Sequence, residues 1–297
     1  MTDDPPSGKG ITGTSTGWGN LFSTIEAGTG RILYVLGSTD RGKTSFCQDL
    51  ISRLSQRELV AYLDLDPGQS TIGPPATLGL AFYRNNEEIP EERCLRFVGA
   101  TSPRGHLLPI LAGAKRLLER ALVSESRAVI IDSPGYIHDE VATEFHLYLI
   151  DLLQPDNLVA IQEKDELEPI LAHFRGHPSM VIHRLLPSPL ARMRGSAERR
   201  RFREKTFREY FADTSLHDLP LEGLGIHGRL PDSFHPEHWQ GLLVALCGPE
   251  QWVVALGIVE SIDLTTQILR IRAPEFDPAR VTSIHIGSMK MDLAGIP

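Results

Sequence analysis

The segment GSTDRGKT at residues 37–44 constrains this chain more than any other feature, because it matches the pattern G-x-x-x-x-G-K-[S/T] of phosphate-binding loops. It follows the apolar run ILYVL at 32–36 and precedes a segment near 44–57 whose apolar residues fall on one helical face. Glycines let a backbone wrap around phosphates, and N–H groups at a helix start bind anions. The sequence therefore predicts a nucleotide-phosphate site on a strand–loop–helix unit.

The residues expected to contact the nucleotide are those of this loop and the start of its helix: Gly37, Ser38, Thr39, Asp40, Arg41, Gly42, Lys43, Thr44 and Ser45. Lys43 is expected to neutralise the β- and γ-phosphates, and Thr44 is expected to hold Mg²⁺.

Short apolar runs alternate with helical patterns over the first two thirds of the chain. Strands are expected at 32–36, 59–63, 128–132, 157–161 and 179–183, and helices near 44–57, 107–123, 139–153 and 164–174. Apolar strands alternating with helices are typical of an α/β fold, a parallel sheet flanked by helices. After about residue 215 the runs at 241–247, 252–260, 267–272 and 281–287 leave no room for helices, which indicates a small antiparallel β domain. We expect a mobile tail at 1–17, a phosphate-loop domain at 18–215 and the β domain at 216–297.

Two aspartates follow the second strand, in the segment DLDPGQ at 64–69. Asp64 is expected to face a metal ion from within the strand. Asp66 could act as a general base on an acceptor hydroxyl or position a metal-bound water. An isolated Asp-Pro-Gly would be interpreted as a turn, but behind a phosphate-loop strand we favour the functional interpretation.

A D-x-x-G segment, Asp132 to Gly135, ends a further strand where phosphate-loop proteins often sense the γ-phosphate. It raises the alternative of a GTPase switch. GTPases that recognise guanine carry the motif Asn-Lys-x-Asp after the next strand, whereas residues 162–166 are QEKDE here. Guanine specificity is therefore unsupported.

The net charge of −8 argues against non-specific coating of nucleic acid. Residues 192–208 have the opposite charge: eight basic and two acidic residues give this segment a net charge of +6, which leaves the rest of the chain with −14. No apolar stretch reaches the roughly 20 residues that span a bilayer, and the N-terminus lacks an apolar signal core. With three widely spaced cysteines, these features predict a cytoplasmic protein that does not bind membranes.

Taken together, these segments resemble those of the polynucleotide 5′-hydroxyl kinases, a family that includes the kinase subunit of the eukaryotic RNA 3′-end cleavage machinery and the nucleolar pre-rRNA processing kinase. The resemblance runs from about Trp18 to the C-terminus and is carried by GSTDRGKTS (37–45), DLDPGQ (64–69), GATSPRG (99–105), DSPGY (132–136), RGSAERRRFREKTFREYF (194–211) and the C-terminal GLLVALCG, LGIVESID and LRIRAP. It implies transfer of the ATP γ-phosphate to the 5′-hydroxyl of single-stranded RNA or DNA, with ATP and Mg²⁺ as cofactors. No protein partner is implied.

The resemblance also assigns roles to individual residues. Asp66 would engage the 5′-hydroxyl and the metal, and Gln69 would order the metal shell. Thr101 and Ser102, of the T-[S/T]-P element, would contact nucleic acid. The family's T-x-G-W clasp is altered here, with Ser133 for Thr and Tyr136 for Trp, so Tyr136 would stack on a base with a smaller face.

The basic segment corresponds to the family's arginine-bearing lid, at 192–211. Its R-x₄-R-x₃-R pattern falls on Arg194, Arg199 and Arg203, which would contact the transferring phosphate as catalytic residues with Lys43 and Asp66. If residues 196–211 form a helix, the aromatic residues further along it pack while these arginines face phosphate. The alternatives left open are a GTPase or ATPase switch, and a non-catalytic ATP-binding scaffold in RNA processing.

Overall fold

The computed structural model of the chain describes residues 12–13, 21–22, 30–89, 92–189, 194–231 and 235–291. These residues form two compact units, each assembled from separate stretches of the chain. The first unit comprises Met1–Tyr62, Phe82–Ile89 and Ala121–Met193, and the second comprises Leu63–Ala81, Pro90–Arg120 and Arg194–Pro297. Trp18 and most of the predicted tail lie outside the described residues. The domain boundary at residue 216 stays a prediction.

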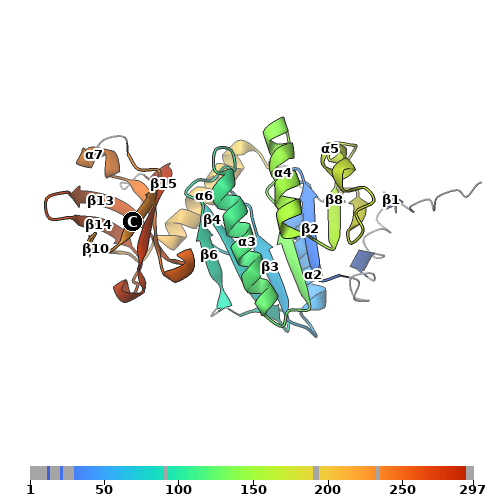
Figure 1. Ribbon diagram of the computed structural model, residues 1–297, viewed down its shortest axis with the longest axis horizontal. Helices are drawn as coiled ribbons and strands as arrows, with labels where there is room; N and C mark the ends of the chain where they lie inside the picture. The colour runs from blue at the N-terminus through green and yellow to red at the C-terminus, as the bar shows by residue number, and fades with distance from the viewer. Residues whose placement is uncertain are drawn as a thin grey trace, which may run out of the picture. The chain divides into compact units, whose positions relative to one another are not determined.

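A nine-stranded sheet contains the strand that precedes the phosphate loop (Figure 1). Its strands lie in the order β1-β9-β8-β2-β7-β3-β4-β5, and β6 pairs with β4. Their bounds are β1 (Thr12–Gly13), β2 (Ile32–Gly37), β3 (Val60–Asp64), β4 (Thr77–Arg84), β5 (Glu87–Glu88), β6 (Cys94–Phe97), β7 (Ala128–Asp132), β8 (Asn157–Ile161) and β9 (Val181–Leu185). β2 pairs in parallel with both β7 and β8, and β8 pairs in parallel with β9. The predicted parallel sheet is therefore confirmed around the phosphate-loop strand.

One edge of this sheet is antiparallel, because β4 pairs in that sense with β5 and with β6. None of these three strands was expected from the sequence. The buried run at 77–82 follows β3 without an intervening helix, so no strand–helix alternation marks it. The sheet is consequently mostly, not wholly, parallel.

Helices flank the sheet as predicted. They are α2 (Lys43–Leu54), α3 (Leu107–Val123), α4 (Glu140–Leu153) and α5 (Glu168–Leu171), the last continued by the 3₁₀ turn η2 (Ala172–Phe174). Figure 1 shows α4 running beside β2. The expected helix at 164–174 begins late, because the side chains of Gln162 and Glu166 bind backbone N–H groups of the preceding loop. Among the described residues, no helix has the length and apolar character needed to cross a membrane.

The C-terminal part of the chain forms a second sheet of six strands, in the order β10-β14-β13-β12-β15-β11. Their bounds are β10 (Ser215–Pro220), β11 (Gly225–Gly228), β12 (Leu242–Cys247), β13 (Val253–Asp263), β14 (Ile268–Ala273) and β15 (Ser283–Lys290). All pairs are antiparallel except β11 with β15. The short helix α7 (Pro236–Trp239) and the 3₁₀ turns η3 (Pro249–Gln251) and η4 (Pro278–Arg280) complete it. The predicted antiparallel β structure at the C-terminal end is confirmed, with one parallel pair at the edge of the sheet.

Both faces of the second sheet are covered by apolar side chains. One face packs around Trp239, Val244, Val259 and Ile271. The other packs against the aromatic end of the helix α6 (Ser196–Tyr210), where Phe207 contributes to the core. The basic helix is thereby joined to the C-terminal sheet within the second unit.

Candidate active site

The phosphate loop forms the turn between β2 and α2 in the first unit. Asp40 and Gly42 both have left-handed backbone conformations, with φ of 62° and 86°. Gly42 is the N-cap of α2 and has no side chain to cap it, so the first N–H groups of the helix are left for an anion. The Lys43 side chain is 7% exposed, and its Nζ donates to the Ser38 carbonyl at 3.1 Å. The predicted loop geometry is therefore present, and the Lys43 side chain folds back onto the backbone of the loop.

A hydroxyl and a carboxylate meet beside the loop. Thr44 Oγ1 donates to Asp132 Oδ2 at 2.6 Å, and the Tyr62 hydroxyl donates to the same oxygen at 3.3 Å. Asp132 ends β7, which is the direct neighbour of β2, and its side chain is buried. The sequence marked Asp132 only as the start of a D-x-x-G segment. The structure adds it to the phosphate-loop site.

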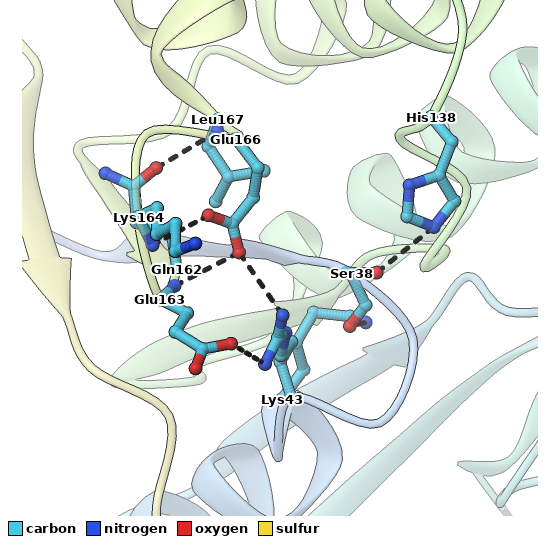
Figure 2. A network of polar contacts seen from close by, with 9 residues as sticks. Ser38, Lys43, His138, Gln162, Glu163, Lys164, Glu166 and Leu167 are labelled. Atoms are coloured by element: carbon cyan, nitrogen blue, oxygen red, sulfur yellow. Dashed lines mark hydrogen bonds and ion pairs between the residues drawn. The ribbon is translucent and has the colours of Figure 1, made fainter. Parts of the chain in front are cut away.

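The D-x-x-G loop lies directly on the phosphate loop. A Cβ placed on Gly135 would lie 2.7 Å from the backbone nitrogen of Thr39, so only glycine fits there. Thr39 Oγ1 donates to the Gly135 carbonyl at 3.2 Å. Ser38 Oγ also lies 3.2 Å from His138 Nε2, as Figure 2 shows. The segment 135–138 is therefore in direct contact with the phosphate loop.

The other side of the phosphate loop is held by the loop that follows β8. Arg41 pairs with Glu163 at 2.7 Å and with Glu166 at 3.8 Å. Figure 2 shows both glutamates turned toward the phosphate loop. Glu166 also accepts the backbone N–H groups of Glu163 and Lys164. Burial raises the pKa of Glu166, but these hydrogen bonds oppose it and the pKa is lowered on balance. No motif in the sequence pointed to this clamp, because it joins residues more than 120 positions apart.

Tyr136 is the residue expected to stack on a base. Its hydroxyl donates to the Asp139 carboxylate at 2.8 Å, and Asp139 in turn caps the N-terminus of α4. Its carbonyl accepts a hydrogen bond from Nε2 of the buried His146, at 3.0 Å. Nδ1 of that ring accepts from the Tyr34 hydroxyl at 2.8 Å, and burial lowers the pKa of His146 to about 3. The half-exposed Tyr136 ring is therefore fixed at its hydroxyl and at its backbone.

The second unit carries the acidic loop. Asp64 is buried, and both of its oxygens bind the loop itself: Oδ1 accepts from the Asp66 backbone N–H at 3.0 Å, and Oδ2 accepts from the N–H and hydroxyl of Thr71 at 2.6 and 2.8 Å. Asp64 thus shapes the loop that presents Asp66. Its predicted place as a metal ligand stays a prediction.

Asp66 is half-buried and is held through one oxygen only. Oδ1 accepts the N–H groups of Gly68 and Gln69 at 2.8 and 3.1 Å, which is the turn that the Asp-Pro-Gly sequence favours. Oδ2 accepts no hydrogen bond from the described residues. The turn interpretation and the functional one are therefore compatible, because the turn orients a carboxylate with one oxygen available.

The T-[S/T]-P element lies against this turn. A Cβ on Gly68 would be 2.5 Å from the Thr101 carbonyl oxygen, so the two backbones are in contact. Thr101 is half-exposed and Ser102 is exposed, and Ser102 Oγ accepts the Arg104 N–H at 3.3 Å. The structure thus brings the Asp66 turn and the Thr101–Ser102 element together within the second unit.

The donor atoms present suit Mg²⁺, which prefers a few oxygen ligands together with substrate phosphates. Gln69 Oε1 is buried and meets no hydrogen-bond donor among the described residues, while its amide nitrogen donates to the Gly68 carbonyl at 2.8 Å. The Thr44–Asp132 pair offers further oxygens in the first unit. No cluster of three or more His, Cys, Asp or Glu side chains able to hold a metal occurs in the described ranges. Each unit on its own therefore offers oxygen atoms that suit Mg²⁺ only together with substrate phosphates.

The predicted lid helix is present as α6. Arg194 precedes it and is exposed, whereas Arg199 and Arg203 lie on its less exposed side. The aromatic end is anchored, because the Tyr210 hydroxyl accepts the Leu256 N–H at 2.8 Å. On the outer side Arg200 pairs with Glu204 at 2.7 Å. The expected division into a packed aromatic half and an arginine half is confirmed, while contact with phosphate stays a prediction. Arg192, at the start of the predicted lid, lies outside the described residues.

The first unit has a P-loop nucleotide-binding fold. Its glycine-rich loop joins a central parallel strand to a helix, Lys43 and Thr44 stand at the start of that helix, and Asp132 lies on the adjacent strand. A family model described as the P-loop of the mRNA cleavage and polyadenylation factor CLP1 matches residues 37–213. The chain belongs to this family.

Curated relatives carry consistent names. The chain is 24% identical over 321 residues to the polyribonucleotide 5′-hydroxyl-kinase of Methanocaldococcus jannaschii, covering 89% of this chain and 88% of that protein. It is 31% identical over 202 residues to the enzyme of the same name from Pyrococcus furiosus, covering 66% of this chain and 55% of the relative. The chain thus spans about half the length of that second relative. The family predicted from the sequence is confirmed.

The fold also matches a solved structure, that of the wild-type Clp1p–Pcf11p complex. The TM-score is 0.71 at 14% sequence identity, over 93% of this chain and 79% of that one. The likeness extends across both the P-loop sheet and the C-terminal sheet, and it confirms the predicted fold class.

Proposed function

We propose that the chain is a polynucleotide 5′-hydroxyl kinase that transfers the γ-phosphate of ATP to the 5′ end of single-stranded RNA or DNA. The proposal rests mainly on the hydrogen bonding of the Asp66 carboxylate. One oxygen accepts two backbone N–H groups of its own turn, and the other accepts no hydrogen bond from the described residues. A P-loop alone would suit a hydrolase or a switch equally well. A fixed carboxylate beside an element expected to contact nucleic acid favours an acceptor hydroxyl.

In the proposed reaction, Asp66 Oδ2 accepts the proton of the 5′-hydroxyl as the acceptor oxygen bonds to the γ-phosphorus. The bond from that phosphorus to the β–γ bridging oxygen breaks, and ADP leaves. Lys43, with Arg194, Arg199 and Arg203 of the lid, stabilises the negative charge that spreads over the transferring oxygens. Thr101, Ser102 and Tyr136 hold the acceptor strand.

Thr44, Asp66 and Gln69 are proposed to hold Mg²⁺, with Asp132 orienting Thr44 through its 2.6 Å hydrogen bond and Asp64 shaping the loop. Mg²⁺, when bound, would neutralise charge on the β- and γ-phosphate oxygens. Support comes from the buried Gln69 Oε1, which has no hydrogen-bond donor among the described residues. We also propose a cytoplasmic location, which agrees with three cysteines that are all free thiols.

The test is transfer of labelled γ-phosphate to 5′-hydroxyl RNA and DNA oligonucleotides. Lys43→Ala and Asp66→Asn should each abolish transfer while the fold survives. The matched controls Lys164→Ala and Asp49→Asn change exposed residues outside the proposed machinery and should leave it intact. Wild-type protein that hydrolyses GTP and phosphorylates no oligonucleotide would establish a switch GTPase instead. Nucleotide binding without any turnover would favour a scaffold in RNA processing.

A further inference from the structure

The loop that carries Thr101 is built onto the C-terminal sheet. Ser288 of β15 donates its backbone N–H to the Gly99 carbonyl at 2.9 Å, and its hydroxyl lies 2.9 Å from His106 Nε2. A Cβ on Gly99 would be 2.7 Å from the Cα of Gly287, so the two backbones touch. Both ends of the loop at 99–106 are thus fixed by the same strand. The β domain therefore positions an element of the proposed acceptor site.

Arg229 joins this loop from the edge of the same sheet. It follows β11, and its backbone N–H donates to the Ile286 carbonyl at 2.9 Å. Gly228 has a φ of 109° and leaves no room for a side chain against β15. The Arg229 guanidinium then reaches the Gly105 carbonyl at 3.0 Å. An exposed arginine is therefore held next to Arg104, which is itself exposed on the loop.

Within the described part of the chain, no carboxylate neutralises the charges of these two arginines. Elsewhere on the sheet, Arg270 pairs with Asp218 at 2.7 Å and Arg272 pairs with Glu260 at 2.8 Å. No acidic side chain of the described ranges pairs with Arg104 or Arg229. Arg229 donates only one guanidinium N–H group, to the neutral Gly105 carbonyl, so the other N–H groups of this exposed guanidinium remain open to solvent. In a chain of net charge −8, two such arginines mark a local site for an anion.

We infer that Arg104 and Arg229 bind the phosphodiester backbone of the acceptor strand, so that the C-terminal sheet supplies part of the nucleic-acid site. This rests on the proposed function. Asp66 contacts the Thr101 segment through its turn, and Arg104 lies three residues further along the same loop. A strand whose 5′ end is at Asp66 would meet these arginines as it leaves. Guanidinium groups suit phosphate oxygens, and such contacts carry no sequence information.

The test measures binding of a single-stranded 5′-hydroxyl decamer by fluorescence anisotropy, without ATP, across a series of salt concentrations. Arg104→Gln and Arg229→Gln should each weaken binding on the order of tenfold. Each should also reduce the slope of log affinity against log salt by about 0.7, the value for one lost phosphate contact on a single strand. The side-chain amide introduced by Arg229→Gln can still donate a hydrogen bond, whereas Arg229→Lys keeps the charge and should keep the salt slope. The matched control is Arg270→Gln on the same sheet, which should change neither quantity.

A purely supporting role for Arg229 would lower the melting temperature or kcat and leave the salt slope at the wild-type value. That result would overturn the inference, as would wild-type affinity in both glutamine variants. Because the binding assay needs no turnover, it separates the two proposals. A wild-type protein that binds the decamer but never phosphorylates it would refute the kinase and leave the arginine site standing.

Discussion

Thr44 and Asp132 are joined by a 2.6 Å hydrogen bond from the threonine hydroxyl to the aspartate carboxylate, although 88 positions separate them in the sequence. The bond links the start of α2 to the end of β7, so the helix that follows the phosphate loop is tied to the strand next to β2. In P-loop proteins such a pair supports the metal that accompanies the nucleotide.

Removing this hydroxyl should impair catalysis through the metal. Thr44→Ala is expected to lower kcat on the order of 100-fold and to raise the Mg²⁺ concentration needed for half-maximal rate. Thr44→Ser keeps the oxygen and should stay close to wild type in both quantities. Steady-state rates over a Mg²⁺ titration check this, and a serine variant as defective as the alanine variant would show that the hydroxyl is not the important group.

The arginines of the lid should act mainly in the transition state. Arg194→Ala is expected to lower kcat much more than it weakens ATP binding, because its contact forms as charge develops on the transferring phosphate. Arg199 and Arg203 should affect both quantities. Arg200→Ala is the matched control, since Arg200 pairs with Glu204 on the outer side of the helix. Normal turnover with poor ATP affinity in the Arg194 variant would assign that residue a different role.

The sequence was sufficient to predict the phosphate loop, because its chemistry is local: the glycines, lysine and threonine lie close together between a strand and a helix. It was equally sufficient for α3, whose observed bounds at Leu107–Val123 are those predicted. It failed for β11, a strand of sequence GIHG whose residues are all exposed. Such a strand has no apolar alternation, and only its backbone pairing with β15 creates it.

The polar partners of the site were predictable only where a motif named them. Asp66 belonged to a recognisable segment, whereas the Arg41 clamp by Glu163 and Glu166 exists only after β2 and β8 have paired. Arg229 was hidden in a turn-rich stretch for the same reason, since its role depends on the fold of a loop more than 120 residues earlier. Tertiary contacts of this kind leave no spacing pattern for sequence reasoning to find.

The buried histidine behind Tyr136 should make the stability of the fold depend on pH. Burial lowers the pKa of His146 to about 3, whereas the unfolded chain takes up this proton near the ordinary value of about 6.5. Below about pH 6.5 the unfolded state therefore binds more protons, and stability falls until about pH 3. His183 and His285, whose pKa values burial lowers to about 4, act in the same direction.

His146→Gln tests this contribution by urea denaturation at a series of pH values. The variant should be less stable at pH 7, and its stability should fall less steeply between about pH 6 and pH 4, by up to about 1.4 kcal/mol per pH unit for one proton. An unchanged slope would mean that the ring is already protonated in the folded protein.

The aromatic end of α6 should be a major source of stability for the second unit. Phe211, the C-cap residue directly after α6, is fully buried against the C-terminal sheet. Phe211→Ala is expected to cost about 3–5 kcal/mol of unfolding free energy, as for other buried aromatic truncations. Leu216→Ala, whose side chain is 54% exposed, should change it by less than about 0.5 kcal/mol. Near-ultraviolet circular dichroism during denaturation distinguishes the two variants, and equal losses of stability would contradict the packing of Phe211 against the sheet.

The last prediction concerns Tyr136 and the form of the acceptor. Its hydroxyl is held by Asp139 and its carbonyl by His146, so the half-exposed ring is oriented for stacking on a base. Stacking requires an unpaired end and tolerates any base, so single-stranded ends and overhangs of many sequences should be better substrates than blunt duplexes.

Tyr136→Ala should raise KM for single-stranded RNA and DNA on the order of tenfold, the effect of losing one stacked base. Tyr136→Phe keeps the ring and should stay within a few-fold of wild type. Kinase assays on matched single- and double-stranded oligonucleotides measure both effects. Blunt duplexes as the best substrates, or an alanine variant with unchanged KM, would eliminate the stacking role, while phosphate transfer itself would still depend on Lys43, Thr44 and Asp66.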